Sequence, residues 1–199
     1  MNTTKFKFKR PGNLRREKQK RVILSAFFFL FLGGLLAVFL ITIRPHQIDG
    51  VSMEPTLQNG DRLFIKKTQQ PKRYELITFY PKENPSDSYV KRVVGLPGDK
   101  IYTEGNALYI NHQMREDQAL RSDTKAKDLP DGTLKVTITK NVWDILVDIE
   151  EIPEDVYFVL GDNRNNSTDS RHFGFVEKKQ IEGVVMFRYY PFDSIGFIN

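Results

Sequence analysis

The chain has 199 residues, a formal net charge of +5 and no cysteine, which excludes disulfides, zinc–thiolate sites and cysteine nucleophiles. The charge is uneven, because residues 1–21 carry nine Lys or Arg and one acidic residue, a net +8, which leaves −3 on the rest. Beyond residue 44 about 155 residues remain, enough for one globular domain or for a core with a small subdomain.

The basic tail, residues 1–21, has two candidate partners. Lysines that alternate with Phe6 and Phe8 are compatible with nucleic-acid binding, but a long apolar run follows at once. Val22 to Ile43 is a run of 22 residues without a charge, and as a helix it would measure about 33 Å, the thickness of a bilayer core. We therefore predict a lipid bilayer as a partner, and no nucleic acid.

The apolar run is interpreted as a retained transmembrane helix, residues 22–43. A cleaved signal peptide has an apolar region of only about 7–15 residues, and no A-x-A-like site precedes Arg44 and Pro45. The positive-inside rule places residues 1–21 in the cytoplasm. The chain from Arg44 onward is then expected on the extracytoplasmic side of the cell membrane, after a single pass.

Strand signals dominate after Pro45, which we expect to end the helix. Short runs rich in β-branched and aromatic residues alternate with turn signals such as Asn59-Gly60 and Pro97-Gly98. The predicted strands are Arg62–Lys66, Glu75–Tyr80, Tyr89–Val94, Ala107–Ile110, Thr133–Thr139, Val156–Leu160 and Gly183–Tyr190. Val142 to Ile152 fits a strand or a short helix, and its periodicity does not decide between them.

The expected fold is therefore mainly β, with antiparallel sheets after the single transmembrane helix. A polar, loop-like stretch from Asn111 to Thr133 separates two groups of strands. We predict a β core formed by residues 44–102 and 157–199, with residues 103–156 inserted as a smaller β subdomain. No internal repeat is present.

Ser52 is a candidate nucleophile in a tight context between Gly50 and Pro55, although a serine in such a turn more often only caps it. A serine hydroxyl attacks a carbonyl only when a base takes its proton. None of the three histidines, His46, His112 and His172, has an evident carboxylate partner that would make it such a base.

Lys91 is the alternative base. Strand alternation places it on the same face as Tyr89 and Val93, opposite Val90 and Arg92. Burial among apolar residues would disfavour the charged amine and lower its pKa towards neutrality. The competing interpretation is a surface lysine with its head group in water, which is the usual position of lysine.

Two further motifs carry polar chemistry. The segment Gly161 to Gly174 (GDNRNNSTDSRHFG) follows an apolar strand and could supply hydrogen bonds to a buried lysine; the alternatives are a solvated turn or a calcium loop, which Arg164 and Arg171 disfavour. Ser122 to Lys125 matches the S-x-x-K pattern of penicillin-binding proteins, but it lies in a polar loop without the supporting elements.

Three blocks in this order, downstream of a membrane anchor, resemble the bacterial type I signal peptidase (leader peptidase) family. They are Gly50–Thr56 (GVSMEPT), Tyr89–Asp99 (YVKRVVGLPGD) and Gly161–Gly174, about 32 residues in all. The resemblance implies an antiparallel β catalytic core with a β insertion, a serine endopeptidase activity and a Ser/Lys dyad. Its substrates would be exported preproteins, cut after small residues in an A-x-A pattern, and it implies no metal or other cofactor.

The resemblance also assigns roles to individual residues. Ser52 matches the nucleophile and Lys91 the general base, while Ser167 matches the serine that hydrogen-bonds the lysine. Asp169 and Arg171 match a supporting pair, and Arg92 matches the arginine beside the base. The Ser52 backbone N–H is an expected oxyanion donor. The sequence departs from some members at Gly50, where they place a serine whose hydroxyl helps to hold the oxyanion.

The short chain and single anchor are most similar to the Gram-positive members of the family. Two other functions remain possible from the residues alone: a self-cleaving Ser/Lys protease of the repressor type, and an anchored β domain that binds peptides without catalysis. The first is disfavoured by the anchor. The sequence does not indicate an oligomeric state or which preproteins are preferred.

Overall fold

The structure is a computed structural model that describes residues 11–111 and 133–198. The start of the basic tail, His112 and the Ser122–Lys125 motif lie outside these described residues. The chain divides into two units, residues 1–42 and residues 43–199.

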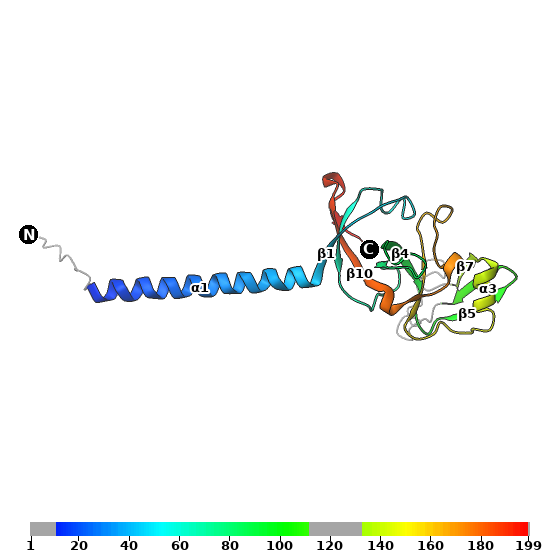
Figure 1. Ribbon diagram of the computed structural model, residues 1–199, viewed down its shortest axis with the longest axis horizontal. Coiled ribbons are helices and arrows are strands. Elements are labelled where there is room, and N and C mark those ends of the chain that lie inside the picture. The colour runs from blue at the N-terminus through cyan, green and yellow to red at the C-terminus, as the bar shows by residue number, and fades with distance from the viewer. Residues whose placement is uncertain (1–10, 112–132, 199) are drawn as a thin grey trace, which may run out of the picture. The chain divides into compact units, whose positions relative to one another are not determined.

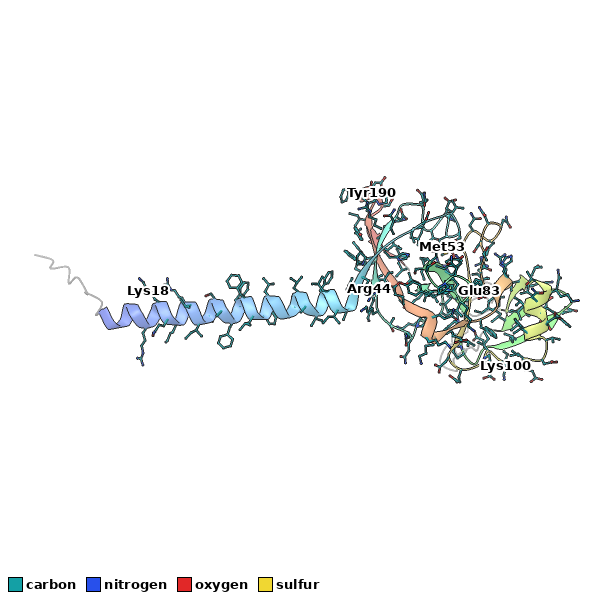
Figure 2. All side chains as sticks on the ribbon, viewed as in Figure 1. Lys18, Arg44, Met53, Glu83, Lys100 and Tyr190 are labelled. Atoms are coloured by element: carbon teal, nitrogen blue, oxygen red, sulfur yellow. The ribbon has the colours of Figure 1, made fainter. Side chains whose placement is uncertain are left out.

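The first unit is a single helix, α1 (Pro11–Thr42), drawn in blue to cyan in Figure 1. Its segment Lys18–Thr42 is 25 residues long with a mean hydropathy of 2.7, which is long and apolar enough to cross a membrane. Among the described residues of the helix, the apolar side chains of this segment are exposed (Figure 2). The helix ends at Thr42, one residue before the predicted end.

The second unit is built on an eight-stranded sheet with the order β1-β2-β10-β3-β4-β8-β9, and β11 pairs with β10. Every pairing in it is antiparallel. The strands are β1 (Ile43–Gln47), β2 (Arg62–Lys66), β3 (Leu76–Phe79), β4 (Tyr89–Gly95), β8 (Val156–Leu160), β9 (Val176–Glu177), β10 (Ile181–Tyr190) and β11 (Gly196–Phe197). The expected mainly antiparallel β fold is confirmed.

Strand β1 was not predicted, because Pro45 lies in its middle. Proline removes a backbone donor and is tolerated only where a strand needs no second partner. β1 lies at the edge of the sheet and pairs only with β2, with Pro45 opposite Phe64. Pairing of Ile43 with Lys66 also explains why the helix stops at Thr42.

A second, three-stranded sheet has the order β5-β6-β7. It consists of β5 (Lys100–Glu104), β6 (Ala107–Asn111) and β7 (Thr133–Thr137), and it is followed by helix α3 (Lys140–Leu146). Within the second unit these elements lie together in Figure 1, at the end away from β1. For Val142 to Ile152, where the sequence fitted either a strand or a short helix, the structure shows a helix over residues 142–146. The expected start of the insertion, residue 103, falls inside β5, so the second sheet begins three residues earlier.

Short helices complete the second unit: α4 (Ser170–Phe173), and the 3₁₀ turns η2 (Lys178–Gln180) and η3 (Phe192–Ser194). One hydrophobic cluster joins the two sheets, since Val94 and Phe158 of the large sheet pack with Leu108 and Ile110 of the small one. Two more clusters lie at the large sheet, and each also contains a residue of β4. Val93 belongs to one and Val90 to the other, as alternation along a strand requires.

Gly183 provides a test of the central strand pairing. A Cβ at this position would overlap the carbonyl oxygen of Lys66 and would lie 2.6 Å from Cγ2 of Ile65. Because Lys66 is already paired with Ile43 and Val184, the backbone of β2 cannot move away without loss of these contacts. We expect Gly183→Ala to lower the free energy of unfolding by about 1–3 kcal/mol, as other overpacked sites do.

The matched control is Gly196→Ala on β11, where an added Cβ meets nothing within 4 Å. It should change the free energy of unfolding by no more than about 0.5 kcal/mol. Denaturant titration of the full chain in detergent measures both variants. Equal stabilities for the two variants would contradict the close approach of β10 to β2.

Candidate active site

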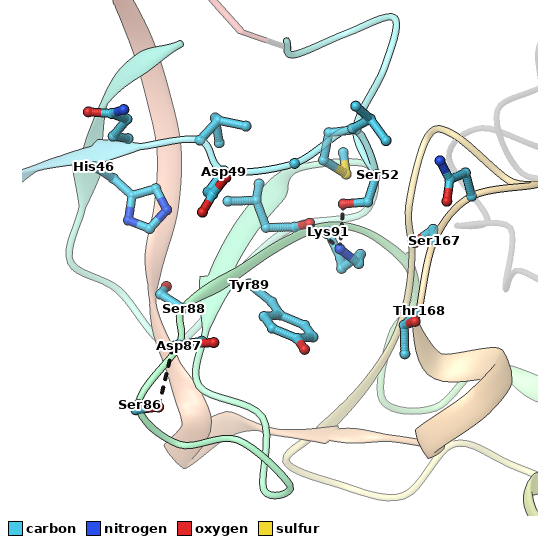
Figure 3. Close-up of a pocket in the computed structure, with 17 residues that line it drawn as sticks. His46, Asp49, Ser52, Ser86, Asp87, Ser88, Tyr89, Lys91, Ser167 and Thr168 are labelled. Carbon is cyan, nitrogen blue, oxygen red and sulfur yellow. Dashed lines mark hydrogen bonds between the residues drawn. The ribbon is translucent and has the colours of Figure 1, made fainter. Parts of the chain in front are cut away.

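Ser52 lies in the turn between β1 and β2, and two neighbours anchor that turn. Met53 and Leu57 are buried in the hydrophobic cluster on one face of the sheet, and the Leu57 N–H donates to the Met53 carbonyl at 3.0 Å. Ser52 directly precedes the first of these anchors, so its side chain is held in place without being fully buried itself. Figure 3 shows Ser52 at the end of the turn, directed towards Lys91.

Lys91 comes from β4, near the middle of the large sheet, and only 4% of its surface is exposed. Its Nζ lies 2.8 Å from Oγ of Ser52 and 2.9 Å from the carbonyl oxygen of Val90. The structure thus brings together two residues 39 positions apart in the chain. The alternative of a solvent-exposed lysine is wrong.

Burial lowers the pKa of the Lys91 amine from 10.5 to about 8, and the negative charge of Asp169 opposes part of this effect. Roughly a tenth of the amine is then neutral at pH 7, a far larger share than for a lysine in water. A neutral amine within hydrogen-bond distance of a hydroxyl can accept its proton. The 2.8 Å separation serves this transfer and the reverse donation equally well.

Asp169 is fully buried and its charge is balanced locally. Arg171 donates to both carboxylate oxygens, from Nε at 2.8 Å and from a terminal nitrogen at 2.9 Å, and the Gly161 N–H donates at 2.9 Å. Burial alone would raise the pKa of Asp169, but these hydrogen bonds outweigh it and hold the pKa below 3.8. The side chain is therefore an ionised acceptor, as the predicted Asp169–Arg171 pair requires.

Ser167 lies in the lining of the same cleft as Ser52 and Lys91 (Figure 3). Its hydroxyl is buried, yet it has no hydrogen-bond partner within the described part of the chain. The expected bond to Lys91 is not formed, because the amine is directed to Ser52 and to the Val90 carbonyl. The side chain instead packs against Gly161, where a Cβ would lie 2.5 Å from Cβ of Ser167.

Arg92 follows Lys91 on β4 and therefore points to the other face of the strand. Its guanidinium binds both oxygens of Asp162, at 2.8 and 2.6 Å, and the carbonyl oxygen of Tyr74 at 2.7 Å. Asp162 also accepts a hydrogen bond from Oγ1 of Thr56 at 2.6 Å. Arg92 is therefore linked to the turn that carries Ser52 through Asp162 and Thr56.

Sequence reasoning missed the residues that tie the polar loop to this turn. The Asn163 N–H donates to the carbonyl oxygen of Ser52 at 3.0 Å, and its side-chain amide donates to that of Val51 at 3.1 Å. Thr56 is held a second time by Arg188, which donates to its carbonyl oxygen at 3.3 Å. The density of polar residues in Gly161–Gly174 was a signal, but no spacing indicated which of them face Ser52.

Gly50 adopts a backbone conformation that favours glycine, with φ of +101°. Its N–H donates to the side-chain oxygen of Asn59 at 3.0 Å, so this donor is already engaged. A Cβ at Gly50 would meet nothing within 4 Å. The position is therefore open, and its conformation rather than a lack of space is what suits glycine.

The dyad lies in a cleft of about 600 Å³. Three segments line the cleft. They are residues 46–53, at the end of β1 and in the turn that carries Ser52, residues 86–91, before and at the start of β4, and residues 166–168 of the polar loop. The three walls come from segments far apart in the chain.

Two histidines are described and neither is bonded to Ser52. His46 lines the cleft, where burial lowers its pKa, although Glu182 opposes the effect. His172 is about half exposed and lies 3.9 Å from Asp169. Within residues 11–111 and 133–198, no group of three His, Asp or Glu side chains could hold a metal ion, and both carboxylates considered for a calcium loop are bound by arginines.

Comparison with known proteins identifies the family. A family model described as "Signal peptidase, peptidase S26" matches residues 19–190, most of the chain. The chain belongs to the type I signal peptidase family. The resemblance seen in the three sequence blocks is confirmed.

Relatives with this description come from Gram-positive bacteria. Signal peptidase IB of Staphylococcus aureus is 37% identical over 181 residues, covering 88% of this chain and 90% of the relative. Signal peptidase I of Bacillus caldolyticus is 38% identical over 162 residues, covering 79% and 85%. A crystal structure of a signal peptidase I from Enterococcus faecalis is 35% identical and covers 58% of this chain and 96% of its own, with a TM-score of 0.37.

The lowered pKa of Lys91 predicts that burial of its amine reduces the free energy of unfolding at neutral pH. The unfolded chain keeps a pKa of 10.5 and the folded chain has a pKa of about 8, so the unfolded state binds more protons between these values. Stability of the wild type should therefore rise from pH 8 towards pH 10.5. Lys91→Met should be more stable than the wild type at pH 7, by up to about 3 kcal/mol, and the gain should shrink above pH 8.

Denaturant titration of both proteins at pH 7 and pH 9.5 measures this difference. The control is Lys66→Met, which makes the same substitution at an exposed lysine of β2 and shows what the exchange does at the surface. If Lys91→Met were less stable than the wild type at both values, the buried amine would not be the costly group.

Proposed function

We propose that the chain is a membrane-anchored serine endopeptidase that removes N-terminal signal peptides from exported preproteins, with Ser52 as nucleophile and Lys91 as general base. The observation that carries the proposal is a buried amine 2.8 Å from the hydroxyl of Ser52, in a member of the signal peptidase family. Preproteins are the substrate because the named relatives are signal peptidases.

The chemistry follows from the dyad. The neutral amine of Lys91 takes the proton of Ser52 as Oγ attacks the scissile carbonyl, which forms a tetrahedral intermediate and an ammonium. The ammonium then returns the proton to the leaving amine as the C–N bond breaks, and an acyl-enzyme remains. A water, deprotonated by the same amine, attacks the ester and releases Ser52.

The Ser52 backbone N–H is the proposed donor to the oxyanion. Among the described residues it has no hydrogen-bond partner, whereas the Gly50 N–H is bound to Asn59. A backbone N–H that is unbonded and held in a fixed position beside the nucleophile can stabilise the negative charge that develops on the carbonyl oxygen of the substrate. The clamps from Arg92 and Asn163 supply this rigidity.

The preferred cleavage site is proposed to carry small residues in an A-x-A pattern. This preference rests on the family resemblance, and apolar side chains of the cleft, including Ile48, Val51 and Val90, are of a kind to form shallow pockets. A larger substrate side chain would clash there, and rejection by clash is an effective source of specificity.

Helix α1 is the proposed anchor, with residues 1–21 in the cytoplasm and the catalytic unit on the extracytoplasmic side of the cell membrane. The length and hydropathy of Lys18–Thr42 and the excess of Lys and Arg before it support this topology. The apolar part of a signal peptide also lies in the bilayer. Confinement of enzyme and substrate to one membrane raises their effective concentration.

The dyad predicts that Ser52→Ala and Lys91→Ala each lower the rate of cleavage by roughly 10³-fold or more, because each removes one half of a single proton-transfer unit. The measurement is cleavage of a preprotein by the full chain in detergent, with the new N-terminus sequenced. Ser86→Ala is a matched control, since Ser86 lines the same cleft but bonds only to Asn84 and Asp87.

Near-normal turnover by Lys91→Ala would refute the assignment of the base. Absence of any new N-terminus with the wild type would favour the non-catalytic peptide-binding alternative.

The pKa of Lys91 predicts a pH profile. Because only the neutral amine accepts the proton, kcat/KM should rise about tenfold per pH unit at low pH and level off above the pKa of about 8. Initial rates with a preprotein between pH 6 and pH 10 measure the profile. A flat profile over this range would rule out a lysine base.

A further inference from the structure

The amine of Lys91 faces the aromatic ring of Tyr89, which takes no part in the proposed proton transfer between Ser52 and Lys91. Nζ of Lys91 lies over the ring of Tyr89, 5.3 Å from its centroid, within the range of a cation–π contact. Tyr89 and Lys91 are two residues apart on β4, so they share one face of the sheet. Figure 3 shows both side chains on the same wall of the cleft.

The ring of Tyr89 is fixed by packing. Phe79, fully buried on the neighbouring strand β3, contacts it edge to face with centroids 6.1 Å apart. Phe79 in turn packs against Phe173 of α4, again with centroids 6.1 Å apart. A ring held in this way keeps its position beside the amine whether or not the amine is charged.

The groups that Nζ bonds are neutral, and the charge of Asp169, which favours the ammonium, is shared with Arg171. From its own strand and from the nucleophile turn, the amine meets the Val90 carbonyl and the Ser52 hydroxyl, both neutral. From the polar loop it meets the field of Asp169, whose two oxygens are already bound by Arg171, and the same loop contributes Ser167 to the cleft without a hydrogen bond to Lys91. His46, Asp49 and Asp87 line other parts of the same cleft.

We propose that Tyr89 is a positioning residue whose ring face stabilises the Lys91 ammonium formed when Ser52 gives up its proton. The proposal rests on the Ser52–Lys91 dyad as the proposed catalytic unit. This role differs from those of Ser167, Asp169 and Arg92. The negative face of the ring attracts the ammonium of Lys91 and has little effect on the neutral amine.

A ring suits this task better than a second carboxylate. An unpaired carboxylate beside the amine would favour the ammonium so strongly that little free base remained at neutral pH. The ring is neutral, and a desolvated cation–π contact favours the ammonium by about tenfold, or one pKa unit. The base then stays available while the charge that appears during proton transfer is still stabilised.

The test compares Tyr89→Leu, which removes the ring, with Tyr89→Phe, which keeps it. Without the ring, the midpoint of the pH profile of kcat/KM should move down by about one unit, and the plateau at high pH should fall about three- to tenfold. Tyr89→Phe should keep the wild-type midpoint. Tyr89→Met is a second ring-free variant that should reproduce the shift should leucine pack badly.

At acid pH the lower midpoint, which leaves more neutral amine, and the lower plateau, which slows each turnover, have opposite effects on kcat/KM. A simple loss of packing would not produce this combination. Near pH 6 the ring-free variants should cleave as fast as the wild type, or up to about threefold faster, and should fall behind only above the midpoint. The packing control is Phe173→Leu, which removes a ring from the same cluster without touching Lys91. It should lower the whole curve, if anything, without moving the midpoint.

A second readout does not depend on activity. The titration of Lys91, followed by NMR of its labelled side chain in the full chain in detergent, should have a midpoint about one unit lower in Tyr89→Leu than in the wild type. An unchanged midpoint, or the same shift in Tyr89→Phe, would overturn the role of the ring. A wild type whose activity does not follow its own Lys91 titration would instead overturn the dyad, so the two failures are distinguishable.

Discussion

The burial of one amine beside one hydroxyl is the constraint on which the rest of this signal peptidase depends. A lysine in water holds its proton far too tightly to serve as a base near neutral pH, and only the removal of water brings its pKa to about 8. That requirement places Lys91 on β4, flanked by β3 and β8, rather than on an edge strand or a loop. The position costs stability, because the folded protein at pH 7 must keep an ammonium largely out of water.

Two Arg–Asp pairs connect the polar loop after β8 to the proposed dyad. Asp169 and Arg171 both belong to the loop, whereas Asp162 of the loop is bound by Arg92 of β4. Arg171 neutralises Asp169, which limits how strongly that buried carboxylate holds the proton of Lys91. Arg92 binds Asp162, which positions the nucleophile turn through Thr56. The loop thus bears both on the charge near Lys91 and on the placement of Ser52, the two residues that lie 2.8 Å apart and form the proposed dyad.

Much of this could be predicted from sequence where the signal was local. The strands β2 and β8 have the predicted limits, and the alternation along β4 placed Lys91 correctly. Long-range partners could not be predicted: Arg92 binds Asp162, 70 positions away in the chain. The two-residue strands β9 and β11 carry too few side chains for a periodic pattern, and β5 mixes exposed polar residues with one buried isoleucine.

The small sheet also contributes to the site, although none of its residues lines the cleft. The backbone N–H of Thr139, just before α3, donates to the carbonyl oxygen of Arg171 at 3.0 Å, and α3 packs near α4. The segment that carries Asp169 is therefore supported on one side by β8, through the bond from the Val159 N–H to Ser170, and on the other by the insertion. Because a displaced Asp169 would change the charge beside Lys91, this support from outside the cleft bears on the pKa of the proposed base.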